Sequence, residues 1–166
     1  MTTLTLVHVL ISLVGIVSGF VVVFGLLAAK RLDGWTAIFL ITTVLTSVTG
    51  FLFFPIHKLM PSHIVGTISL IVLAVALYAR YVRQLAGPWR WTYVVTATLA
   101  LYFNVFVLVV QSFLKVPALK ALAPTQTEPP FAIAQGLVLL LFLVLGTFAV
   151  KRFRIEPLSM VTAALR

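Results

Sequence analysis

Three side chains with metal-binding chemistry are evenly spaced in one short polar segment. His57, Met60 and His63 follow one another with two residues between each pair. Imidazole nitrogens and thioether sulfurs are ligands that suit copper, and His8 or Met1 could complete the set. The segment is therefore a candidate copper site. The competing interpretation is a plain turn between two helices, because Pro61 interrupts any regular helix through it.

Haem and quinone are two further candidate ligands. Both would use polar residues near those ends of the apolar segments that we expect on the outer side of a membrane. His8 and His63 could be axial ligands of a haem held between the first and third segments. A quinone could instead lie among His8, Gln111 and Gln135, which share a depth about one turn from those ends. The same side chains could equally be hydrogen-bonding groups that hold helices together. Copper, haem, quinone and helix packing all remain open as interpretations.

Several reaction types do not fit this composition. The chain has no cysteine, which excludes disulfides, thiolate metal sites and thiol catalysis. Its acids, Asp33, Glu128 and Glu156, lie between the apolar segments, so a carboxylate proton relay inside a membrane is not expected. No P-loop, HExxH or GxSxG signature is present. We therefore expect no catalytic activity unless a bound cofactor supplies the reactivity.

Five long apolar segments must position these residues. They cover residues 4–29, 36–54, 64–82, 92–114 and 131–150. Each reaches roughly the 20 residues that a helix needs to cross about 30 Å of hydrocarbon. In a chain of 166 residues that is 62% hydrophobic and 9% charged, no room is left for a soluble domain. The sequence predicts an all-α integral membrane protein, with residues 1–166 forming one bundle of five transmembrane helices.

The basic residues gather on one side of this arrangement. With the amino terminus outside, the cytoplasmic side holds Lys30, Arg31, Arg80, Arg83, Arg90, Lys151, Arg152, Arg154 and Arg166, and the outer side holds Lys58, Lys115 and Lys120. This positive-inside bias predicts an outer amino terminus and a short cytoplasmic tail over residues 151–166. The net charge of +9 then reflects topology, so the lipid bilayer is an expected partner and nucleic acid is not. We expect Arg80 and Tyr78 to extend toward the headgroups.

Two short helices are expected outside the spans. Four prolines in the connection between the last two spans confine any helix there to about residues 118–123, where it could lie along the membrane interface. The tail from Pro157 to Leu165 could form another on the cytoplasmic surface.

Small and polar residues mark the faces that should pack against protein. His8, Ser12, Gly15 and Gly19 fall on one stripe of the first span, and hydroxyl residues line the second span from Thr42 to Gly50. We expect these faces to recognise a second copy or a protein partner, so that bulky residues at Gly15 and Gly19 would disperse the assembly.

Several short elements in the first half of the chain resemble a group of known proteins. Residues Thr49 to Pro55, the His63-Ile64-Val65-Gly66 element and the early His8 are similar to small, mostly uncharacterised multi-pass proteins of the bacterial inner membrane. The resemblance implies that membrane as the location and implies no particular activity.

The leading functional hypothesis is a noncatalytic membrane protein that is oligomeric or an accessory subunit of a larger complex. The first alternative is a haem-, copper- or quinone-binding protein with a site near the outer face. The second is a small channel or transporter whose path follows the hydroxyls of the second span and Asn104.

Overall fold

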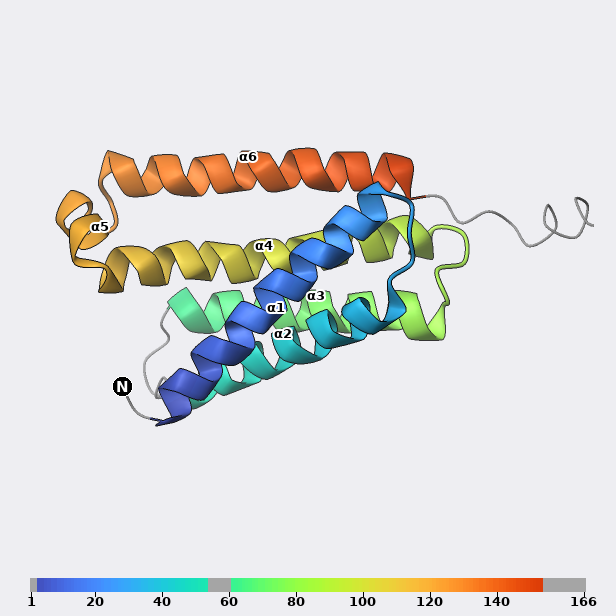
Figure 1. The fold of residues 1–166 in the computed structure, drawn as a ribbon, viewed down its shortest axis with the longest axis horizontal. Helices are drawn as coiled ribbons and strands as arrows, with labels where there is room; N and C mark the ends of the chain where they lie inside the picture. The colour runs from blue at the N-terminus through green and yellow to red at the C-terminus, as the bar shows by residue number, and fades with distance from the viewer. Residues whose placement is uncertain (1–2, 54–60, 154–166) are drawn as a thin grey trace, which may run out of the picture.

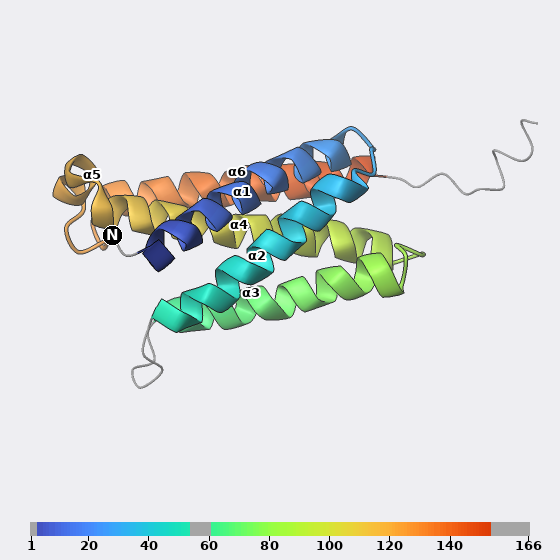
Figure 2. The ribbon, with the colours of Figure 1, turned by 60° about the horizontal axis from the view of Figure 1, so that its bottom comes forward.

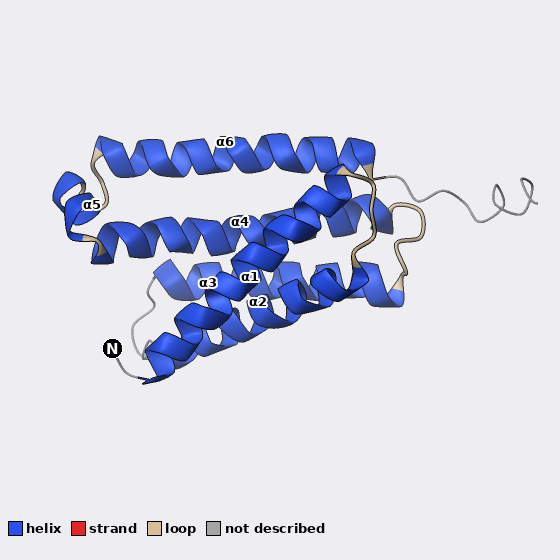
Figure 3. Cartoon of the chain, viewed as in Figure 1, coloured by secondary structure: helices blue, strands red, loops and turns tan. Residues whose placement is uncertain are grey.

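The protein is a bundle of helices (Figures 1 and 3). The computed structural model describes residues 3–53 and 61–153, without the side chains of residues 52–53 and 61–63. The elements are α1 (Thr3–Leu27), α2 (Asp33–Phe53), α3 (Pro61–Leu77), the π-helical turn η1 (Tyr78–Val82), α4 (Trp89–Lys115), α5 (Pro117–Leu122) and α6 (Pro129–Arg152). No strand occurs in these ranges. Five of the helices are long and apolar enough to cross a membrane, which confirms the prediction of a helical multi-pass membrane protein.

The helices extend beyond the apolar segments at several ends. Proline is favoured in the first turn of a helix, and α3 begins at Pro61 and α6 at Pro129. α2 begins at Asp33, whose negative charge suits the positive end of the helix dipole. Polar and proline residues that a hydropathy pattern assigns to connections therefore belong to helix ends.

α1 and α4 form the centre of the bundle. α1 crosses the other helices obliquely and contacts α2, α4 and α6, while α4 contacts α1, α3 and α6 (Figures 1 and 2). The side chains buried between them include Val23, Phe39, Leu73, Leu101 and Phe142. Because lipid is as apolar as these side chains, close backbone approach and polar contacts must contribute to their association.

Gly15 and Gly19 allow this close approach within the chain itself. A Cβ on Gly15 would lie 3.1 Å from the Thr42 hydroxyl oxygen, and one on Gly19 would lie 2.5 Å from Leu101 Cδ1 and 2.9 Å from a Phe39 ring carbon. The stripe is a packed face, as expected, but its neighbours are α2 and α4. The expectation that Gly15 and Gly19 meet a partner protein is therefore wrong in this fold.

Successive helices run in alternate directions, which brings most of the described basic residues to one end of the bundle (Figure 1). We call this the basic end. It holds Lys30, Arg31, Arg80, Arg83, Arg90, Lys151 and Arg152, whereas Lys115 and Lys120 lie at the opposite end. Each connection among the described residues lies at the end that the sequence predicts for it, and this alternation is independent of which end faces the cytoplasm.

The connection between α4 and α6 contains the short helix α5, close to the residues expected for it. After α5, Glu128 accepts hydrogen bonds from the Thr125 hydroxyl and from the backbone N–H groups of Thr125 and Thr127. Slight desolvation raises the pKa of Glu128, but these hydrogen bonds outweigh it and leave the pKa below its ordinary value. The expected tail helix from Pro157 to Leu165 lies outside the described residues.

Candidate functional site

The proposed copper ligands fall largely outside the described part of the chain. His57 and Met60 lie in the segment 54–60, and His63 is in the first turn of α3, where only the backbone is described. Within residues 3–53 and 61–153, no group of three or more acidic or histidine side chains is placed to hold a metal ion. The copper motif and the pairing of His8 with His63 around a haem stay predictions.

His8 belongs to the contact between α1 and α2. Its Nδ1 lies 2.7 Å from the Thr49 hydroxyl oxygen, one of the hydroxyls that line α2. A Cβ on Gly50 would lie 3.9 Å from His8 Cε1, so the imidazole also covers that glycine. The histidine therefore has a structural partner on the neighbouring helix.

One amide of the predicted quinone site belongs to a different helix contact. Gln135 Nε2 donates to the Phe106 carbonyl oxygen across the α4–α6 contact, at 3.2 Å, and Gln111 is half-buried near the end of α4. Figure 1 shows the start of α1 beside α2 and well away from the start of α6. His8 and Gln135 are therefore not brought together, although they lie toward the same end of the bundle.

Polar contacts continue along α2 at the middle of the bundle. Asn104 Nδ2 donates to the Thr43 hydroxyl at 3.1 Å, beside Gly15. Ser47 and Ser69 pair their hydroxyls at 3.3 Å, which joins α2 to α3. The hydroxyl of Thr46 is buried without a partner in the described part of the chain. Most of the hydroxyls that suggested a transport path thus contribute to contacts between helices.

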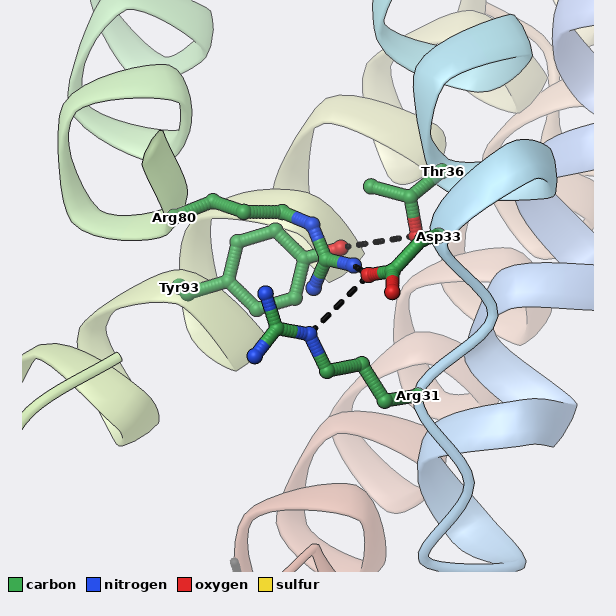
Figure 4. Close-up of polar contacts among 5 residues, drawn as sticks. All are labelled: Arg31, Asp33, Thr36, Arg80 and Tyr93. Carbon is green, nitrogen blue, oxygen red and sulfur yellow. Dashed lines mark hydrogen bonds and ion pairs between the residues drawn. The ribbon is translucent and has the colours of Figure 1, made fainter. Parts of the chain in front are cut away.

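A buried arginine at the basic end is the most unusual polar group in the described residues (Figure 4). Only 2% of the Arg80 side chain is exposed, and its guanidinium forms an ion pair with Asp33 at the start of α2. Arg31 Nε lies 2.9 Å from the same Asp33 oxygen. The carboxylate, 68% exposed, therefore lies between two arginines.

Arg80 lies on the buried side of the π-helical turn η1. The Arg83 N–H donates to the Tyr78 carbonyl, five residues earlier, at 2.9 Å. This pattern fits one extra residue into the turn. Ala76, Ala79 and Arg80 are all buried, at the spacing of three and four residues that also puts side chains on one face of a regular helix. Leu85 has a positive φ of 60° and is also buried, which anchors the connection that follows.

Tyr93 of α4 supports the arginine from a third element. Its ring lies with its centroid 5.0 Å from the Arg80 guanidinium carbon, and its hydroxyl donates to the Thr36 hydroxyl at 3.4 Å (Figure 4). A cation over an aromatic face gains about 2 kcal/mol when both groups are desolvated. The cluster of Arg31, Asp33, Thr36, Arg80 and Tyr93 therefore connects α2, η1 and α4.

This cluster corrects the expectation that Arg80 extends toward the headgroups. Its side chain turns into the protein, because a carboxylate and an aromatic face are available there. Tyr78, by contrast, is 44% exposed and meets Trp89 edge to face. The sequence contained one signal for this contact, an ionisable residue inside a predicted span. Its natural partner was Asp33, the acid expected at the same end of the bundle.

Comparison of the chain with protein-family models, curated proteins and solved structures gives no match.

Proposed function

We propose that the chain is a noncatalytic integral membrane protein that works as an oligomeric or accessory subunit of a membrane complex. The observation that carries this proposal is the exposure of α6. Of the residues in the most apolar 18-residue stretch of each helix, 11% are buried within the chain in α6, against 44% in α1. A helix with so few buried residues leaves many of its side chains available to lipid or to another protein.

Gly136 of α6 is a small residue that leaves space for a partner helix to pack closely. A Cβ added to Gly136 would meet no heavy atom within 4 Å, and Ala132 lies one turn earlier on the same exposed side. Small residues let two helix backbones approach closely in lipid. We therefore assign the partner contact to this part of α6.

The pairing of the polar side chains favours a structural role for them. His8 pairs with Thr49, Asn104 with Thr43, and Arg80 with Asp33, each across two helices. These groups stabilise the helix contacts of the bundle. Their use in packing supports a noncatalytic protein over a channel along the second span.

The proposal also assigns a membrane and an orientation. We place the basic end in the cytoplasm, with the amino terminus outside, because basic residues concentrate in cytoplasmic connections. The resemblance to small multi-pass proteins of bacteria favours the inner membrane as the location.

The test is a bulky residue at Gly136. We expect Gly136→Leu to reduce the mass of the purified particle, measured by light scattering in mild detergent, because the leucine blocks the partner while meeting nothing in its own chain. Gly34→Leu is the matched control, since Gly34 is another helical glycine with nothing within 4 Å, and it should leave the mass unchanged. An unchanged mass and unchanged copurifying proteins in Gly136→Leu would contradict the assignment.

The ligand-binding alternative has its own measurement. An absorption spectrum, elemental analysis and lipid extraction of the gently purified protein report haem, copper and quinone. One equivalent of any of these, lost in His8→Ala, would replace the subunit proposal with a ligand-binding function.

A further inference from the structure

A groove runs between α4 and α6 toward the basic end. Its volume is about 450 Å³, and its lining includes Thr98 and Tyr102 of α4 with Leu143, Gly146, Thr147 and Lys151 of α6. Apart from the threonine and tyrosine hydroxyls and the lysine, these side chains offer apolar surface. Leu143 is 59% exposed, so the groove opens toward the surroundings of the bundle.

The shape of the groove follows from two contacts between its helices. A Cβ on Gly146 would lie 3.4 Å from Thr98 Cγ2, so the helices approach closely at the floor. Tyr102 meets Phe142 edge to face, with the ring centroids 5.7 Å apart, and these two rings contribute to the wall. Both contacts use residues of the chain itself, so the groove is present without a partner.

The length of the groove matches one leaflet. The lining residues of α6 run from Leu139 to Lys151, which is about 18 Å at 1.5 Å per residue. Half of a hydrocarbon core of about 30 Å is about 15 Å. A spanning helix would need a contact along both leaflets, whereas the acyl chain of one lipid needs only this length.

The end of the groove near the membrane surface is cationic. Lys151 is exposed and is part of the lining, and Arg90 Nη1 lies 3.4 Å from the Val150 carbonyl oxygen on the same turn of α6. Asp33, the acid described at this end, is engaged by Arg31 and Arg80. The positive charge beside the groove is therefore not neutralised by a carboxylate in its lining.

From this charge and this length, we propose that the α4–α6 groove binds one anionic phospholipid from the leaflet at the basic end. An acyl chain lies along Tyr102, Leu143 and Gly146, and the phosphate lies at Lys151 beside Arg90. Basic pockets between transmembrane helices bind anionic headgroups in this way. The inference does not rest on the proposed subunit function.

The test compares lipids in nanodiscs of defined composition. Native mass spectrometry counts the molecules of phosphatidylglycerol or phosphatidylcholine that the full chain retains. We expect one tightly held phosphatidylglycerol per chain, and Lys151→Gln should weaken its retention about fivefold, as one lost cation predicts. Lys151→Arg should restore retention. Arg152→Gln, which removes a neighbouring charge outside the lining, should have a smaller effect.

A second pair of variants tests the apolar part. Thr147→Trp fills the groove from an exposed position and should abolish retention of the lipid. Val144→Trp adds the same ring to an exposed residue that does not line the groove, and should not. Circular dichroism and elution volume confirm that each variant folds.

Three results would overturn the proposal. Equal retention of phosphatidylcholine shows that the headgroup is not recognised. Equal losses in Lys151→Gln and Arg152→Gln show a diffuse surface attraction. A fall in particle mass in Thr147→Trp, with no lipid retained by the unaltered chain, assigns the groove to a protein partner.

Discussion

Arg80 is held by groups from separate elements, and this makes the effects of substitution unequal. Its guanidinium meets Asp33 of α2 and the ring of Tyr93 of α4. Removing one partner of a buried ion pair leaves an uncompensated charge and destabilises by about 3–5 kcal/mol, whereas replacement by apolar groups is often close to neutral. Asp33 is 68% exposed, so water reduces the effect here.

We expect Asp33→Asn to lower the free energy of unfolding by about 1–3 kcal/mol, because it leaves the Arg80 charge buried without its carboxylate. Arg80→Met removes that charge and should cost less. Arg31→Gln breaks only an exposed pair and should cost less than about 1 kcal/mol. Unfolding in mixed micelles measures all three. A double Asp33→Asn, Arg80→Met variant no more stable than Asp33→Asn alone would show that the buried charge is not the cause.

The helices themselves illustrate what a sequence of this kind reveals. Their number follows from length and hydropathy, because a span needs about 20 apolar residues. Which helices contact one another does not follow from length and hydropathy, since the lipid-facing and protein-facing sides of a helix are equally apolar. The Gly15 and Gly19 stripe was recognisable as a packed face, but nothing in it specifies Phe39 and Leu101 as the neighbours.

The candidate sites were harder to predict than the helices. Arg80 was visible as an ionisable residue within a span, yet its inward direction depends on its contacts with Asp33 and with Tyr93, which lies beyond a connection. His8 is separated from Gln135 because α1 follows an oblique path across the bundle. No short sequence pattern predicts that path.

We expect Gly19→Ala to destabilise the bundle by about 1–3 kcal/mol, as overpacking of a close contact does. The added methyl group would lie 2.5 Å from Leu101 Cδ1 and force α1 away from α4. Gly136→Ala is the control, because its methyl group meets open space. Thermal unfolding should separate the two variants. If Gly19→Ala changed particle mass without lowering the midpoint, α1 would be a partner face after all.

At the scale of the whole molecule, the five long helices alternate in direction between two ends, and the chain has no cysteine. Single cysteines can therefore report the position of each end. We expect Lys120→Cys to react with an impermeant maleimide in intact cells, and Lys30→Cys to react only after lysis, because the basic end is proposed to be cytoplasmic. Both lysines are exposed, so their reactivities are comparable. Labelling only at Lys30→Cys would reverse the orientation.

The contact between α1 and α6 has a consequence for biosynthesis. It joins the earliest of the described helices to leave the ribosome to the latest, across more than a hundred residues of chain. α1 also packs against α4, so most of its partners are translated after it has entered the membrane. Until then its glycines have lipid, or the insertion machinery, as neighbours. Translation that stops before α6 therefore leaves α1 without one of the contacts that it has in the complete bundle.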